Sequence, residues 1–453
     1  MTIARPQPGT PRPYRLPPFS RTRLANGVEV IVAPFHRLPV ATVRIIVEAG
    51  ATSDAPGRAG ESWLTARSLV EGTATQSAEE IAAAVERLGG ELEPDLDWND
   101  ISISTTIRNT AVPEALGVMG ALVDQPTFPE SGVLRNQTEQ ISEREQAKRD
   151  PREHADDMFA RVAYEPGARF ALPEAGDAEL IRHFGRETVL GFHSAHFMPQ
   201  RTCVIVVGAV NTEDTVDQVA ATLGAWSATA TGNPRTDVDI PSATPAIHVV
   251  DRPGAAQSEL RIGHIGVPRL HPDYFALVVM NSVLGGLFSS RINLNLRERH
   301  GYTYGAFSAF HWRVQAGPFV ISTAVQTDAT AAAIREVLTE VNRIRDERIS
   351  EDERSLAVNY LAGVFPIRYE TTAAIAAGLA AMRIFGLPAD YFDTYRERIL
   401  AVSAEDVLRV ARAHLRPEQL QIVALGEARD IEPQLASLER PLVRLDGTTP
   451  NER

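Results

Sequence analysis

The hydrophobic positions of this chain follow two periods, that of strands and that of helices. Apolar runs at residues 28–34, 40–50, 202–208 and 420–426 predict buried strands. Strict alternation at residues 101–107 predicts a half-solvated strand. Strands and helices come in separate runs, and this grouping favours an α+β fold over a doubly wound sheet.

Two predicted helices carry clear start signals. Ser77 with Glu80, and Ser350 with Glu353, match the capping box, in which each side chain bonds the backbone N–H group of the other residue. In the first of these helices Gly89 follows the last apolar position and predicts the helix end.

One short pattern occurs twice along the chain: a histidine at a helix end, a proline stop, and a buried strand that ends at glycine. The two copies are His196, Pro199, Gly208 and His414, Pro417, Gly426. Each position is offset by 218, as from 196 to 414. A repeat of this length is too long for a solenoid, so it predicts two homologous domains in tandem.

The proline and glycine content suggests where these domains begin and end. Residues 1–19 are proline-rich and predict an extended lead, and residues 227–246 are rich in Ser, Thr, Pro and Gly and predict a linker. The predicted domains are therefore residues 20–226 and 247–453. Each is expected to hold an antiparallel-rich sheet packed with helices.

Composition narrows the range of partners. The 453 residues carry a net charge of −13, which disfavours nucleic acid and anionic membranes as partners. No run reaches about 18 apolar residues, so no membrane span is predicted. The first residues lack the apolar core of a signal peptide. A cytoplasmic location is expected, and a periplasmic one stays open if a signal peptide has been removed.

Isolated cysteine and histidine residues give little evidence of chemistry. Cys203, the single cysteine, lies inside an apolar run and is expected to be a buried core residue rather than a nucleophile. His193 and His196 are spaced for one helix face, but no acidic base lies between them. Ordinary helix-end histidines are the favoured interpretation.

The stretch AGESWLTARSLVEGT at residues 59–73 resembles the zinc helix of the pitrilysin, or inverzincin, peptidases. In that family H-x-x-E-H supplies two metal ligands and a general base. The matching positions are Ala59, Gly60, Leu69, Gly72 and Thr73. In place of His, Glu and His this chain has Trp63, Ala66 and Arg67.

The resemblance covers nearly the whole chain and also locates the family's third zinc ligand. Glu143 lies 76 residues after Arg67, close to where that ligand is expected. One carboxylate does not hold zinc alone, because such sites need three protein ligands. Glu143 is therefore expected to be a relic paired with Arg67, and this chain is expected to bind no metal.

A second resemblance lies in LGGLFSSRINLNLRERHGYTYGAFSAF, residues 284–310. The pattern predicts a helix from Ser289 to His300, an end at Gly301, and a strand from Tyr302 onward that carries Tyr304. By spacing alone, a structural role for Arg297 and Tyr304 is favoured. The residues that match the family segment are Leu284, Gly285, Gly286, Ser289, Ser290, Arg291, Leu296, Arg297, Glu298, Gly301 and Tyr304, whereas Tyr302 stands where leucine is usual.

The resemblance implies roles for this pair. Tyr304 would donate its hydroxyl to the oxyanion of the scissile carbonyl, and Arg297 would hold a substrate carbonyl. The chain would then be the non-metal-binding subunit of a heterodimeric zinc endopeptidase. A homologous partner would carry H-x-x-E-H and the Zn²⁺, and peptide would add as a strand to the partner's sheet edge.

Two alternatives stay open at this point. The chain could be a catalytically inactive structural or assembly subunit, like the core proteins of respiratory complexes, or a homodimeric peptide-binding protein. A scaffold has no need of Arg297 and Tyr304, and this favours the shared-site interpretation.

Overall fold

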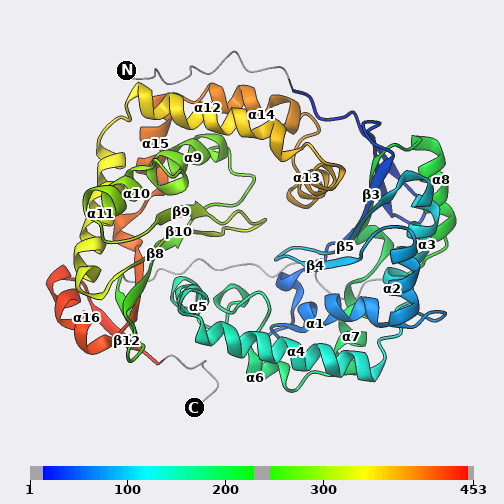
Figure 1. Cartoon of the computed structure of the whole chain (residues 1–453), viewed down its shortest axis with the longest axis horizontal. Coiled ribbons are helices and arrows are strands. Elements are labelled where there is room, and N and C mark those ends of the chain that lie inside the picture. Colours follow the sequence, from blue (N-terminus) through cyan, green and yellow to red (C-terminus); the bar gives the residue numbers. More distant parts are fainter. Residues whose placement is uncertain (1–13, 229–244, 447–453) are drawn as a thin grey trace, which may run out of the picture.

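Two mixed sheets of six strands each, packed with helices, make up the computed structural model, which describes residues 14–228 and 245–446. Figure 1 shows the two halves side by side, with the first sheet in blue and cyan and the second mainly in green. The strand orders are β1-β2-β6-β3-β5-β4 and β12-β7-β11-β8-β10-β9. The α+β class with two domains is as predicted.

Within described residues 14–228, the first half holds six strands and eight α-helices, with these bounds: β1 Ser20–Arg23, β2 Glu29–Pro34, β3 Val40–Val47, α1 Glu61–Ser68, α2 Ala78–Arg87, β4 Glu93–Leu96, β5 Ile101–Arg108, α3 Val112–Asp124, α4 Glu130–Arg149, α5 Pro151–Ala163, α6 Ala178–Ile181, α7 Arg186–His196, β6 Thr202–Gly208 and α8 Thr212–Leu223. The second half holds β7 Ile247–Asp251, β8 Gln257–Ile265, α9 Tyr274–Asn281, α10 Arg291–Asn293, β9 Ala306–Phe310, β10 Pro318–Gln326, α11 Thr330–Asp346, α12 Glu351–Arg368, α13 Thr372–Phe385, α14 Tyr391–Leu400, α15 Ala404–His414, β11 Gln421–Gly426, α16 Ala428–Leu435 and β12 Leu442–Leu445.

The two sheets repeat one pairing scheme. In the first, β2 pairs in parallel with β6, and β6, β3, β5 and β4 then follow in antiparallel order. In the second, β7 pairs in parallel with β11, and β11, β8, β10 and β9 follow in the same way. The strands β6 and β11 are those marked by the sequence repeat.

Each half also covers the sheet of the other half. Helix α5 packs on β8 and β11 of the second sheet, where Phe159 lies in an apolar cluster with Val423. Helix α13 packs on β3 and β6 of the first sheet, where Leu379 shares a cluster with Ile205. In Figure 1 α5 lies near the strands of the second half, and α13 lies near β3 of the first half. The two halves are therefore interlocked rather than merely adjacent.

Several local expectations are confirmed. Both capping boxes are present, at Ser77 of α2 and at Ser350 of α12. Gly89 follows the end of α2 and has φ +80°. The expectation of a half-solvated β5 was wrong, because Ser102 and Ser104 are both buried. Arg44 of β3 donates to Ser102 Oγ at 2.8 Å, so long side chains of neighbouring strands cover the polar face.

The proposed domain limits stay predictions. Residues 229–244 of the predicted linker and residues 1–13 of the predicted lead lie outside the described residues. Within the lead, residues 14–19 form no helix or strand, and the Tyr14 hydroxyl donates to the Tyr369 carbonyl at 2.9 Å.

One described segment, Tyr274–Arg299, is long and apolar enough to span a membrane by composition. In its apolar window of 18 residues 61% of the residues are buried inside the molecule, and the segment is interrupted at Leu287, whose backbone is extended. Burial and interruption are what a core segment requires, and they do not suit a continuous lipid-facing helix.

Candidate active-site segments

Helix α1 carries the residues that stand in the zinc positions. It begins after Gly60, whose φ of 105° is a left-handed conformation that suits glycine. The buried Asp54 carboxylate accepts from the backbone N–H groups of Gly60 and Ser62, each at 2.8 Å, and so neutralises the helix start. Arg169 in turn holds Asp54 at 2.9 Å, which fixes the first turn of the helix.

Arg67 lies between α1 and α4 as a fixed cation. Its guanidinium is 3.0 Å from Glu143 and 3.8 Å from Glu139, both on α4, and its central carbon is 5.2 Å from the ring centre of Trp63. The expected pairing of Glu143 with Arg67 is therefore present. Glu139 was not foreseen, although its spacing of four from Glu143 on one helix face could have indicated it.

These side chains do not fit zinc. Trp63 and Ala66 offer no ligand atom, and the Arg67 guanidinium has only donors and a permanent positive charge. The two glutamates alone do not make up the three protein ligands that a catalytic zinc site needs.

The second segment is built from irregular helical turns. A π-helical turn at Ser282–Gly286 leads into α10, and a second π-helical turn, Leu294–Arg299, carries Arg297. A side-chain carbon on Gly285 would lie 2.7 Å from the backbone nitrogen of Ser308, so glycine is required where this turn meets β9. π-Helical turns occur frequently at functional sites.

Arg291 of the matched segment has a structural role that sequence alone did not assign. Its guanidinium binds both oxygens of Glu353, at 2.6 and 3.0 Å, and ties α10 to the start of α12. Burial opposes ionisation of Glu353, but the hydrogen bonds from Arg291 and Ser350 outweigh it and lower the pKa of Glu353 to about 2.

Arg297 lies in the last helical turn, as expected, and its side chain is 34% exposed. The guanidinium carbon lies 4.6 Å from the ring centre of Phe288 and a guanidinium nitrogen is 3.6 Å from Glu298. Stacking on a ring restricts the arginine while its donors stay available at the surface.

Tyr304 lies in a turn before the strand, and the expectation that the strand begins at Tyr302 was wrong. The strand β9 starts at Ala306. The Thr303 hydroxyl exchanges hydrogen bonds with the backbone of Gly305, and the Thr323 hydroxyl donates to the Gly305 carbonyl at 3.0 Å. These bonds hold the turn, and the Tyr304 side chain is 92% exposed.

Helix termination at Gly301 is confirmed, since this glycine has φ +66°. Tyr302, the departure from the family segment, stacks on His300 at 5.0 Å between ring centres. Its backbone N–H donates to the Leu296 carbonyl at 2.9 Å. The tyrosine is therefore accommodated without disturbing the turn that presents Tyr304.

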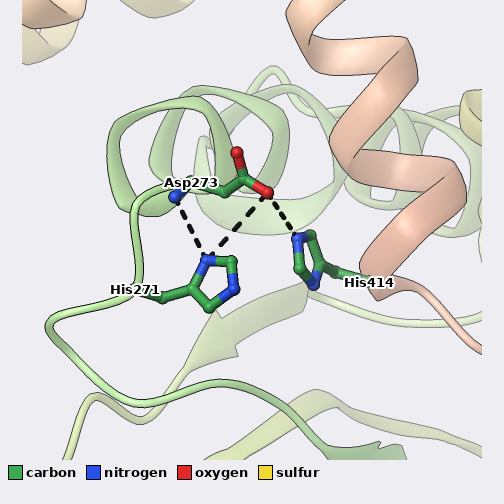
Figure 2. Close-up of side chains that lie close together, drawn as sticks. All are labelled: His271, Asp273 and His414. Atoms are coloured by element: carbon green, nitrogen blue, oxygen red, sulfur yellow. Dashed lines mark hydrogen bonds and ion pairs between the residues drawn. The ribbon is translucent and has the colours of Figure 1, made fainter.

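In the described part of the chain, one group brings three potential metal ligands within 4.8 Å of one another: His271, Asp273 and His414 (Figure 2). Asp273 accepts from His414 at 2.7 Å and from Arg409 at 2.8 Å, and its own N–H donates to His271 Nδ1 at 3.1 Å. Each ligand atom thus has a protein partner, and we interpret the group as a clasp between the start of α9 and the end of α15.

The remaining candidates lie in the core. Cys203 is 1% exposed, as expected, and burial raises the pKa of its thiol. His193 hydrogen-bonds with the Val123 carbonyl at 2.9 Å, and His196 lies 3.3 Å from Arg201. Burial lowers the pKa of His196 to about 4. These are the contacts of ordinary helix-end histidines.

Comparisons with known proteins agree on one family. The sequence profile described as "Insulinase (Peptidase family M16)" matches residues 30–169, and that described as "Peptidase M16 inactive domain" matches residues 183–361. A protein named as an uncharacterized zinc protease from Streptomyces coelicolor is 23% identical over 397 residues, 86% of each chain. Another so named, from Mycobacterium tuberculosis H37Rv, is 24% identical and covers 92% of this chain and 96% of its own.

Solved structures share the fold. The peptidase M16 inactive domain from Pseudomonas fluorescens superposes with a TM-score of 0.83 and 24% identity, and covers 90% of this chain and 98% of its own. A protease from Helicobacter pylori superposes with a TM-score of 0.85 and 18% identity, and covers 90% of this chain and 100% of its own. Together, the two profiles, the relatives and the shared fold establish that this chain belongs to the M16 peptidase family.

Proposed function

We propose that this chain is the non-metal-binding subunit of a heterodimeric zinc endopeptidase, and that it supplies Arg297 and Tyr304 to a site whose zinc the partner chain holds. The observation that carries the proposal is Tyr304: a phenol 92% exposed on a turn held by threonine hydrogen bonds. An exposed tyrosine on a fixed backbone suits a group that acts on something outside its own chain.

The two side chains suit peptide hydrolysis. Attack on a peptide bond places negative charge on the carbonyl oxygen, and a preplaced donor is worth about 3 kcal/mol in such a site. The Tyr304 hydroxyl is such a donor. Arg297 stays charged at any working pH and is steadied by Phe288, so it can hold a backbone carbonyl of the peptide.

The residues at the H-x-x-E-H positions of α1 support a site shared between two chains. Arg67 places a permanent cation beside Glu143, where the resemblance would put the metal, so under this proposal a second subunit supplies the zinc. The relatives named zinc proteases and the match to an inactive-domain profile support a role of this chain in peptide hydrolysis. A homologous subunit with H-x-x-E-H is the partner that the proposal requires.

The decisive experiment is peptide hydrolysis by this chain, by the H-x-x-E-H chain from the same genome, and by their mixture. We expect activity only in the mixture and its loss with chelator. Tyr304→Phe should lower kcat of the mixture roughly 10- to 1000-fold, because it removes one oxyanion donor. Tyr302→Phe, two residues away and stacked on His300, is the matched control and should leave kcat unchanged.

Assembly is measured separately by size-exclusion chromatography, and Tyr304→Phe should still form the complex. An unchanged kcat in Tyr304→Phe would contradict the shared site. A stable complex without peptidase activity would favour the assembly-subunit alternative instead.

A further inference from the structure

A hollow of about 610 Å³ lies on the second sheet directly beside Tyr304. Its lining comes from three neighbouring strands, from the turn at Tyr304 and from Arg152 and Asp156 of α5. The strand residues include Phe307 and Ala309 of β9, Ser322 and Ala324 of β10, and Glu259 of β8. Ligand sites in proteins have volumes of about 300 to 1,000 Å³, so this hollow has the size of a binding site rather than a packing defect.

The strand register explains the shape of the hollow. Phe307 lies opposite Ser322, which lies opposite Arg261, and Ala324 lies opposite Glu259. The middle strand β10 thus contributes small side chains between Phe307 of β9 on one side and the charged residues Arg261 and Glu259 of β8 on the other. Phe307 is 54% exposed and its ring faces solvent in this chain.

The charged side chains on the β8 side of the hollow are bonded to one another. Arg261 is 2% exposed and pairs with Asp156 and, at 3.0 Å, with Glu259. Its remaining nitrogen donates to the Arg152 carbonyl at 2.9 Å. Because these charges are engaged with one another, the surface most readily offered to a ligand is the ring of Phe307 above Ser322 and Ala324.

The outer edge of β9 is closed to an added strand. The Asn281 amide donates to the Ser308 carbonyl at 3.0 Å, and the Ala306 N–H donates to the Asn293 side chain at 3.0 Å. Side chains therefore take two of the hydrogen-bonding groups that strand addition would need, and the turn at Ser282–Gly286 packs against the same strand. A peptide near Tyr304 can present side chains to this sheet, but it cannot extend the sheet at β9.

We propose that the hollow receives an aromatic side chain of the peptide substrate and so selects peptides by an aromatic residue near the cleaved bond. The inference rests on the proposed function, since it assigns a subsite next to Tyr304. A ring entering above Ser322 and Ala324 would stack against Phe307, and aromatic pairs favour such offset contacts. The small side chains of Ser322 and Ala324 leave room for the ring of the substrate.

The first test uses the assembled pair and a peptide series in which one aromatic residue moves along an alanine-rich sequence. Ala324→Leu and Ala309→Leu fill the hollow from two sides. We expect each to lower kcat/KM for the best aromatic peptide about 10-fold or more, with little effect on the all-alanine peptide. Ala82→Leu, at an exposed position of α2, is the control and should change neither value.

The second test needs no partner and separates this inference from the proposed function. A peptide that carries benzoylphenylalanine is photo-crosslinked to the full chain alone, and the attached residues are mapped by mass spectrometry. We expect crosslinks at the hollow that Ala324→Leu removes and Ala82→Leu retains. If the assembled pair were inactive, the proposed function would be overturned. The crosslinking would still show whether the hollow binds an aromatic side chain.

Three results would overturn the inference: crosslinks spread over the surface, filled-hollow variants that cleave all peptides as the wild type does, or crosslinks that vanish when the partner binds. The last would mean that a side chain of the partner, and not of the peptide, fills the hollow.

Discussion

Arg67 shows at the scale of one residue how the helix that resembles the family's zinc helix is held without an ion. Its guanidinium lies beside Glu139 and Glu143, so the carboxylates on α4 still face a positive charge. Without a cation these two carboxylates, four residues apart on one helix, would repel each other. Trp63 fills the position of the first ligand and stacks on the same guanidinium.

This arrangement predicts that zinc binding can be restored by three changes. The triple variant Trp63→His, Ala66→Glu, Arg67→His recreates H-x-x-E-H on α1, and Glu143 already lies 3.0 Å from the side chain at position 67. The two histidines, four residues apart, would lie on one helix face. We expect about one zinc ion per triple-variant chain, measured by atomic spectrometry after dialysis.

Adding Glu143→Gln to the triple variant is the control and should abolish stoichiometric zinc, because only two protein ligands would remain. Zinc retained by this fourfold variant would show that Glu143 is not the third ligand.

Among the structural elements, the segment from α9 to β9 shows what sequence can and cannot predict. The helix end at Gly301 and the place of Arg297 in the last turn follow from local signals. The turn at Tyr304 follows only in part, because beside the local bonds of Thr303 it is held by Thr323, a residue of another strand. Likewise the bidentate pair of Arg291 with Glu353 joins residues 62 apart. Local pattern carries no information on such contacts.

The clasp between α9 and α15 leads to a prediction on acid stability. The Arg409 hydrogen bond, opposed by partial burial and helped by His414, lowers the pKa of Asp273 to about 2. A carboxylate whose pKa is lower in the folded state stabilises that state above its unfolded pKa, and loses this effect as the pH falls toward 2. Asp273→Asn should therefore be less stable than the wild type at pH 7.

The difference should shrink between about pH 4 and pH 2, measured as the urea midpoint at each pH. A constant difference across that range would mean that packing of the Asp273 side chain, and not its charge, stabilises the clasp.

The whole molecule combines an internal repeat with an exchange of helices. The repeat could be predicted from His196 and His414 and their following strands, and the two sheets do share one pairing scheme. The exchange could not, because α5 is amphipathic and α13 is apolar over most of its surface, and neither pattern says which sheet the helix covers. Phe159 of α5 lies over Gly263 of β8, where a side chain would approach within 2.9 Å of its ring.

This exchange predicts that neither half folds alone. Fragments 1–236 and 237–453, expressed separately, would each expose a sheet face and an apolar helix face that now cover one another, so each should aggregate. Expressed together, they should co-purify as a soluble pair.

Phe159→Asp in the first fragment should abolish co-purification, because Phe159 is 3% exposed and the change places a charge in an apolar cluster. Leu134→Asp, on an exposed face of α4, is the matched control. A cooperative unfolding transition in either lone fragment would contradict the interlocked arrangement, and the halves would then be free to move against each other.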